Sequence, residues 1–389
     1  MTSELEPTPA DAGESLPIVE CAGAPGAAPE NPVGVAEPPA AAPDTGTGPA
    51  TEAEAASSPG PVEAAPMTGR RKALLVLLTS VFAVFVVFTG WYLLNRKPIT
   101  QLPLPVITVE QVPHYAFSVY GVSAPTGVAV SPDGSRIYVT QTEQDAKVLV
   151  FDRGGRLLAT VTPPSATGSQ HAPVYVALNP TSGDLYVTDR PTGSIYVFSS
   201  DGVYRRTFDP GPTLVGWQPL GLSFDQRGDL FVTDVSGPYH RVHEFDQDGK
   251  LVRTIGTAGL LNFPNGVAVD GRGYIYVSDS NNGRLVVFDA SGQQASVIRR
   301  GSAEGDLGIP RGTAVDGDGR VYVVDTMAQG VQVYQAYEAG ERAPRFIGRF
   351  GVEGTADGGF EYPNGVAVDA RGRVYVTDWR NNRVQVWSW

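Results

Sequence analysis

The stretch Phe263–Asp289 reads FPNGVAVDGRGYIYVSDSNNGRLVVFD, and nearly the same text returns at Tyr362–Trp387 as YPNGVAVDARGRVYVTDWRNNRVQVW. Each copy has three short runs rich in Val, Ile and Tyr, which favour strands. Asp, Asn and Gly fill the gaps between the runs and supply the conformations that tight turns need. We therefore predict three antiparallel strands per copy, and the chain beyond about residue 115 consists of variations on this unit.

The unit occurs six times when the chain is aligned on the proline before each first strand. Successive prolines lie 45 to 53 residues apart. A repeat of this length that contains only strands and turns predicts a six-bladed β-propeller, an all-β fold. The aligned prolines are Pro125, Pro173, Pro219, Pro264, Pro310 and Pro363.

A fourth, outer strand is expected after each three-strand unit. Candidate segments follow the first five units, at residues 156–161, 203–208, 250–255, 295–299 and 345–350. No such segment follows the sixth unit, but residues 116–121 resemble residues 346–351. We expect this early segment to complete the sixth blade and close the ring, which would leave no sheet edge open there.

The units resemble the NHL-repeat family, in which Pro-x-Gly-Val-Ala-Val-Asp, Tyr-Val-x-Asp and Asn-x-Arg-Val-x-Val-Phe follow one another. The resemblance covers residues 116–389. It implies that the Asp after each second strand caps a turn and pairs with a nearby Asn and Arg, here Asn281 with Arg284 and Asn381 with Arg383. Unit one has Gln141 at this position, which suggests a degenerate blade; the other units have Asp189, Asp234, Asp279, Asp325 and Asp378.

The N-terminal segment 1–69 differs sharply from the repeats. It has eleven acidic residues, no Lys or Arg, and few large apolar residues. Such a segment cannot bury enough apolar surface to offset its ordering entropy, so we predict a disordered tail. The rest of the chain is nearly neutral, which argues against a nucleic-acid partner. The single cysteine, Cys21, excludes a disulfide within the chain.

Residues 73–94 are uncharged, and Arg70–Lys72 precede them. A helix of 22 residues spans about 33 Å, enough to cross a hydrocarbon core of about 30 Å. We predict a single-pass membrane anchor over residues 70–97, followed by a Pro-rich spacer over residues 98–115. The positive-inside rule favours a cytoplasmic N-terminus, which places the propeller outside the membrane. The protein resembles bacterial single-pass membrane proteins.

The inner strands offer one candidate site at the axis of the propeller. Gluconolactonase-like propellers hold a divalent metal there with Asn residues, and Asn265 and Asn364 occupy the matching positions. The Glu of that family is missing, and Arg311 lies between the two Asn blades, where its permanent charge would repel a cation. The three side chains suit an anion or carboxylate better. We predict no metal, no cofactor and no catalytic residue.

A second candidate site lies where two sets of loops open on one face: those that precede first strands and those that join second to third strands. Aromatic residues and Arg dominate binding hot spots. These loops contribute Trp217, Tyr239, His240, Trp379 and Arg380, besides Arg311. His240 and His243 would lie on opposite faces of a strand, so they are not an obvious metal pair.

These features predict a membrane-tethered, extracytoplasmic binding or sensing module. Its ligand would be a protein, a peptide or a glycan on the loop face. It resembles the sensor halves of bacterial receptor kinases, although no kinase motif is present. The alternatives are a gluconolactonase-like or lyase-like propeller enzyme with a metal at the axial channel, and a passive cell-envelope scaffold.

Overall fold

A computed structural model of the protein describes residues 69–95, 112–143, 146–164 and 171–389. The chain divides into two units, Met1–Pro103 and Leu104–Trp389. The predicted disordered tail and most of the predicted spacer lie outside the described residues. In the N-terminal part, Met1–Pro103, the described residues form the helix α1 (Gly69–Asn95). Across the described segments, no helix has both the length and the apolar character that a membrane crossing needs.

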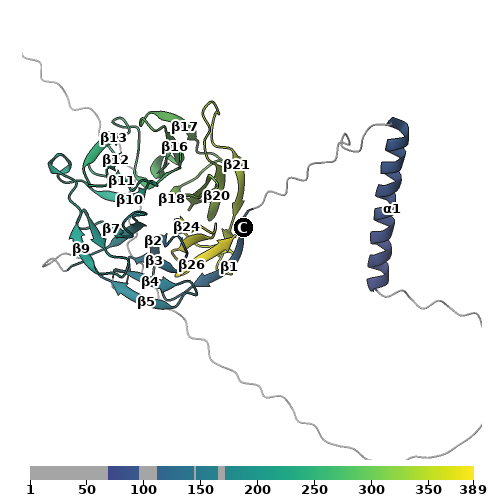
Figure 1. Ribbon diagram of the computed structural model, residues 1–389, viewed down its shortest axis with the longest axis horizontal. Coiled ribbons are helices and arrows are strands. Elements are labelled where there is room, and N and C mark those ends of the chain that lie inside the picture. The colour runs from purple at the N-terminus through teal and green to yellow at the C-terminus, as the bar shows by residue number, and fades with distance from the viewer. Residues whose placement is uncertain (1–68, 96–111, 144–145, 165–170) are drawn as a thin grey trace, which may run out of the picture. The chain divides into compact units, whose positions relative to one another are not determined.

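The second unit is a ring of six four-stranded antiparallel sheets, as predicted. Figure 1 shows the sheets as blades around a central axis, with β2, β10, β18 and β24 toward the centre and β5, β9 and β13 at the rim. Each inner strand begins at one of the six aligned prolines. In blades four and six this proline pairs with the Asp that ends the second strand, Asp279 or Asp378.

The strands of blades one to three follow the chain from the axis outward. Blade one consists of β2 (Pro125–Val130), β3 (Arg136–Gln141), β4 (Lys147–Asp152) and β5 (Leu157–Val161). Blade two consists of β6 (Pro173–Leu178), β7 (Leu185–Asp189), β8 (Ser194–Phe198) and β9 (Tyr204–Thr207). Blade three consists of β10 (Pro219–Phe224), β11 (Leu230–Asp234), β12 (Arg241–Phe245) and β13 (Leu251–Ile255).

Blades four to six continue the same order. Blade four consists of β14 (Pro264–Val269), β15 (Ile275–Asp279), β16 (Arg284–Phe288) and β17 (Gln294–Ile298). Blade five consists of β18 (Pro310–Val315), β19 (Arg320–Asp325), β20 (Gly330–Gln335) and β21 (Phe346–Phe350). Blade six consists of β24 (Pro363–Val368), β25 (Val374–Asp378), β26 (Arg383–Ser388) and β1 (His114–Val119). A short parallel pair, β22 (Val352–Glu353) and β23 (Gly359–Phe360), lies between blades five and six.

The ring closes through β1, which pairs with β26 as the outer strand of blade six. The prediction of this closure is confirmed. The strand begins at His114. The first and last strands of the propeller therefore share one sheet, and β1 covers the edge of β26 that would otherwise be unpaired.

Glycine is required where the inner strands pack side by side around the axis. A Cβ atom at Gly221 would lie 2.1 Å from the carbonyl oxygen of Asn265 in the next blade, and one at Gly266 would lie 2.4 Å from that of Arg311. Five blades have Gly at this third position of the inner strand. Blade two has Tyr175 instead, and its side chain enters the channel, as described below.

The opposite end of each blade is fixed by a repeated set of polar side chains. In blade five, Asp316 Oδ1 accepts hydrogen bonds from the backbone N–H groups of Asp318 and Arg320, and its Oδ2 accepts the Tyr322 hydroxyl at 2.9 Å. Blades four and six repeat this arrangement with Asp270 and Tyr276 and with Asp369 and Tyr375. We call this end, formed by the turns between first and second strands, the turn end.

Candidate functional site

The two sets of loops named in the sequence analysis meet on one face of the propeller, as predicted, and we call it the loop face. The Tyr362 ring, just before β24, lies 6.2 Å from the Trp379 ring, which follows β25. The Arg190 guanidinium, after β7, lies 5.5 Å from the Phe263 ring, just before β14. Contacts of this kind join the loops that precede inner strands to the loops that join second and third strands.

The repeated Asp residues of the loop face are structural caps. Asp378 is fully buried and accepts the backbone N–H of Glu361, Nδ2 of Asn381 and Nε of Arg383 at 2.8 to 2.9 Å. Asp234 accepts the N–H groups of Gln218 and Ser236. Burial raises its pKa, but hydrogen bonds from His243 and these N–H groups outweigh burial and lower the pKa to about 2. Each cap holds the loop that precedes the inner strand of its own blade.

Two details of the predicted caps are wrong. In blade four the amide partner of Asp279 is Asn282, at 2.8 Å, whereas Asn281 contacts Asn262. Blade one is not degenerate: it has four paired strands, and the side chain of Gln141 accepts the Ser123 N–H at 3.0 Å. An amide oxygen replaces a carboxylate oxygen here because the cap needs an acceptor and not a charge.

His240 belongs to a set of side-chain bonds between neighbouring blades. Its Nδ1 accepts the Phe263 N–H of blade four at 2.7 Å. Gln329 accepts the Tyr362 N–H at 2.7 Å, and Asn382 accepts the Ala124 N–H at 2.8 Å, so blades five and six, and six and one, are joined in the same way. We call these three bonds the blade latches. Each accepted N–H belongs to a residue with positive φ directly before the aligned proline.

The candidate residues at the axis converge in the channel, although they come from different blades. Arg311 Nη1 lies 3.4 Å from Asn265 Oδ1. Asn364 Oδ1 accepts the hydroxyl of Tyr175, a residue of blade two, at 2.8 Å. Burial raises the pKa of Tyr175 to about 12, although the nearby charge of Arg311 acts in the opposite direction. Tyr175 was not predicted; its signal in the sequence is the loss of the repeated Gly.

Trp379 and Arg380 form a cluster on the loop face together with Tyr362. The Arg380 guanidinium lies 4.9 Å from the Tyr362 ring and 5.9 Å from the Trp379 ring, and 3.8 Å from the Glu361 carboxylate. Tyr362 is 46% exposed, and Arg380 is also exposed. We call Tyr362, Trp379 and Arg380 the aromatic–arginine cluster. Its residues come from two loops of the same blade.

The other two candidates of the loop face lie apart from this cluster. Tyr239 is 52% exposed, in the loop that joins β11 and β12. Trp217 is 6% exposed and packs against Phe208 and Phe245 in the core between blades two and three. Trp217 is a core residue because the loop before β10 places its ring between blades two and three. The residue type alone does not reveal this burial.

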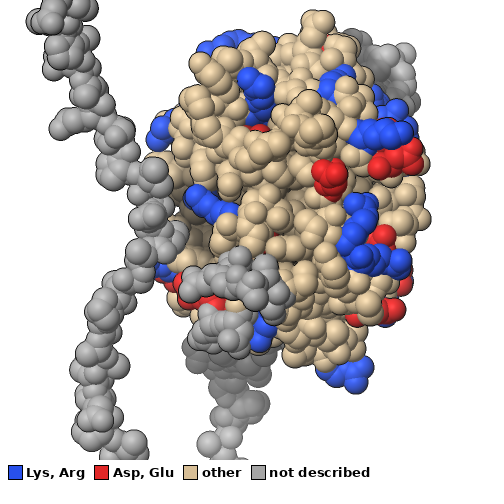
Figure 2. Space-filling view, turned by 90° about the vertical axis from the view of Figure 1, so that its left-hand side faces the viewer, with Lys and Arg blue, Asp and Glu red and all other residues tan. Residues whose placement is uncertain are grey.

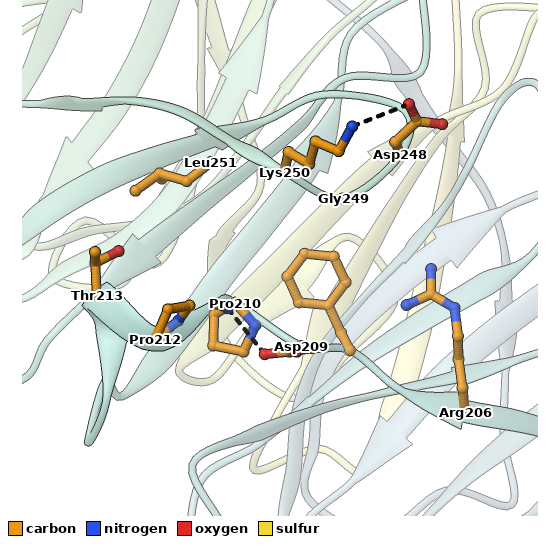
Figure 3. A pocket seen from close by; sticks show the side chains of 11 residues that line it. Arg206, Asp209, Pro210, Pro212, Thr213, Asp248, Gly249, Lys250 and Leu251 are labelled. Atoms are coloured by element: carbon orange, nitrogen blue, oxygen red, sulfur yellow. Dashed lines mark hydrogen bonds and ion pairs between the residues drawn. The ribbon is translucent and has the colours of Figure 1, made fainter.

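The most prominent pockets lie away from the loop-face candidates. One, of about 420 Å³, lies between β9 and the β12–β13 turn; Figure 3 shows Lys250 and Asp248 on one side of it and Pro210 and Pro212 on the other. A second, of about 480 Å³, lies between blades three and four and is lined by paired charges, including Glu244 with Arg253. Neither contains a predicted site residue.

Among the described residues, the charged side chains form no candidate metal-binding group and, on the side shown in Figure 2, no continuous basic surface. Within the described residues, no three His, Cys, Asp or Glu side chains form a group that could hold a metal ion. On the side of the molecule shown in Figure 2, basic side chains stand singly or beside acidic ones, with uncharged surface between them.

Comparisons with known proteins identify the repeat. Residues 261–288 and 360–387, in blades four and six, match the NHL repeat family. NHL repeat-containing protein 3 of Mus musculus is 30% identical over 219 residues, which are 55% of this chain and 51% of that protein. Protein brain tumor of Drosophila melanogaster is 32% identical over 127 residues, 31% of this chain and 12% of that protein. The chain thus spans about half or less of these relatives.

Similar solved structures are found at low sequence identity. A streptogramin B lyase has a TM-score of 0.49 and 14% identity, over 70% of this chain and 96% of that one. A chain of a nidogen/laminin complex has a TM-score of 0.46 and 20% identity, over 59% of this chain and 84% of that one. The six sheets identify this protein as a six-bladed propeller, and two of its blades match the NHL repeat family.

Proposed function

We propose that the propeller is a binding module whose partner is a protein or peptide that lies on the loop face, over the aromatic–arginine cluster. The observation that carries the proposal is the cluster itself. Two aromatic rings and a guanidinium lie within 6.2 Å of one another, at the surface of a rigid ring. Aromatic and Arg side chains bring large contact areas at a small cost in conformational entropy, and they dominate interface hot spots.

The rigidity of the cluster supports the proposal. The backbone N–H of Tyr362 is held by Gln329, and that of Arg380 by the carbonyl oxygen of Glu361 at 3.1 Å. Side chains on a backbone that is already ordered lose less entropy when they bind. The contrast with Trp217 is informative: that ring is buried and has a packing partner, whereas Tyr362 presents an open surface.

The metal-dependent alternative does not fit the geometry at the axis. The Asn265 oxygen that would face a cation already faces the Arg311 guanidinium, and its amide nitrogen donates to Ser280 at 2.8 Å. A divalent ion at this oxygen would meet a permanent positive charge.

The test is a direct binding measurement with the full-length protein. A partner captured from the source cell envelope is purified, and its dissociation constant is measured for wild type and for Trp379→Ala/Arg380→Ala. We expect at least a tenfold weaker affinity for the double variant. The matched control is Tyr204→Ala/Arg205→Ala, which removes an adjacent aromatic and Arg from the exposed strand β9. Equal affinities for all three proteins would refute the proposal.

We also propose that residues 70–97 tether the module to a membrane, with the N-terminus in the cytoplasm and the propeller outside. This tether is proposed from the sequence alone, from the uncharged run 73–94 and the basic residues before it. If it is correct, the full-length protein stays in the membrane fraction after carbonate extraction, and protease added to intact cells removes the propeller. Release into the carbonate supernatant would contradict it.

A further inference from the structure

We infer that the loop-face end of the axial channel is a binding site for a carboxylate group, with Arg311 as its cationic anchor and Asn364 as a second donor. This inference deepens the proposed function and rests on it in one respect: the carboxylate is taken to belong to the peptide or protein partner. The site itself consists of residues from four of the six blades, namely Tyr175, Asn265, Arg311 and Asn364.

The positive charge of Arg311 has no carboxylate partner among the described residues. The buried arginines that belong to the repeated caps do have one: Arg284 pairs with Asp279 at 2.7 Å, and Arg383 with Asp378 at 2.8 Å. Arg311 has only the amide oxygen of Asn265, at the long distance of 3.4 Å, and its buried Nε has no hydrogen-bond partner. A guanidinium that is mostly withdrawn from water without a counter-charge is unfavourable.

The surrounding side chains can donate hydrogen bonds to a bound group. The oxygen of Asn364 accepts the Tyr175 hydroxyl, and its N–H₂ group can donate to a ligand. The oxygen of Asn265 faces Arg311. A bound group must therefore bring acceptor oxygens and negative charge, and a planar carboxylate matches the planar fork of a guanidinium.

Tyr175 adds a fourth blade to the site. Where five blades have Gly at the third inner-strand position, blade two has this large ring, and its hydroxyl reaches blade six past the intervening blade one. The ring is buried, and the charge of Arg311 is close enough to act on its hydroxyl. A ligand group would be partly shielded from water there, which strengthens its interaction with the guanidinium.

The experiment uses the purified full-length protein and small sodium carboxylates as probes. Thermal unfolding is followed while acetate replaces chloride at constant ionic strength. We expect a saturable rise in Tm for wild type and at least a tenfold loss of apparent affinity for Arg311→Met. Arg371→Met, which removes the same charge from the exposed turn between β24 and β25 at the turn end, should respond like wild type.

A second readout separates loss of the site from loss of the fold. Without added carboxylate, Arg311→Met should have a Tm equal to or above that of wild type, because it removes a charge that lacks a counter-charge. Trp379→Ala/Arg380→Ala should respond to acetate like wild type, since neither residue belongs to the channel site. Failure of the channel site and failure of the loop-face interface are thus distinguishable.

The source of the carboxylate is tested with short peptides that differ at one group. A peptide with a free C-terminal carboxylate should compete with acetate if a chain end enters the channel, and an amidated peptide with an internal Asp should compete if a side chain does. The inference is overturned if wild type shows no saturable response, if Arg311→Met responds equally, or if sulfate and phosphate bind while carboxylates do not.

Discussion

The turn end and the loop face of the propeller use the same kinds of polar side chain, but these side chains have more hydrogen-bond and charge partners at the turn end. At the turn end, Asp369 satisfies the Arg373 guanidinium at 2.7 Å and the Tyr375 hydroxyl at 3.1 Å, all within one blade. At the loop-face end of the channel, Arg311 has a single amide contact. The difference teaches that residue type does not identify a site here. A polar group that lacks a full set of partners does.

The largest expected effect comes from the loop-face caps, which belong to the scaffold although they lie on the binding face. Asp378→Ala should lower the free energy of unfolding by about 3–5 kcal/mol, because it leaves the buried Arg383 with only the exposed carboxylate of Asp357 at 3.6 Å. Urea unfolding of the full-length protein measures this. Gln141→Ala removes the equivalent neutral cap of blade one and should cost about 1 kcal/mol. Equal losses would contradict the assignment of the larger cost to the charge.

A smaller effect is expected midway between the two ends, where the inner strands touch. Gly365→Ala places a Cβ atom 2.5 Å from the carbonyl oxygen of Thr126 and should cost about 1–3 kcal/mol by overpacking. Gly317→Ala is the matched control, because its Cβ atom would meet nothing within 4 Å. If both substitutions leave the melting temperature unchanged, the inner ring is less tightly packed than described here.

At the turn end, the third prediction tests whether the repeated hydroxyl contributes to stability. Tyr322→Phe removes a hydroxyl that donates to Asp316 at 2.9 Å and accepts the Trp389 Nε1–H at 2.8 Å. The free energy of unfolding should fall by about 1–1.5 kcal/mol, since Asp316 and Trp389 each lose a hydrogen bond while the ring that fills the core stays in place. Tyr204→Phe alters an exposed hydroxyl and should be silent in the same unfolding experiment.

The smallest effect concerns the blade latch at His240 and depends on pH. Burial lowers the pKa of His240 below 6.5, and Nδ1 must stay unprotonated to accept the Phe263 N–H. The unfolded chain binds this proton more readily, so stability is full above pH 6.5 and falls as the pH drops below it.

His240→Asn tests this latch, because Asn382 already performs the same role in blade six. When the pH is lowered from 7.5 to 5.5, we expect the free energy of unfolding of the variant to fall by about 1 kcal/mol less than that of wild type. The unfolding free energy at the two pH values gives the comparison, and the other histidines cancel between the proteins. If wild type and His240→Asn lose the same free energy of unfolding between the two pH values, the latch does not depend on protonation.

Much of the fold could be predicted because its signals are local and repeated six times. The inner strands begin at the aligned prolines, and the caps follow the second strands, where the repeat places them. The sequence also indicated Arg311 as the departure between two Asn blades. It did not indicate Trp217 as a core residue or His240 as a latch, because burial and partners depend on how a loop lies against the next blade.

The amino-acid sequence by itself determined the six blades, their order and the closing strand, because strand periodicity and turn residues act over a few positions. Only the tertiary structure decided which polar groups are satisfied. The hydrogen bond from Tyr175 to Asn364 joins residues 189 positions apart, and ring closure brings Arg311 into the same channel. Whether a buried charge has a partner depends on such long-range contacts. The sequence therefore indicated Arg311 and the two Asn residues, but only the closed ring showed that Tyr175 joins them and that Arg311 lacks a counter-charge among the described residues.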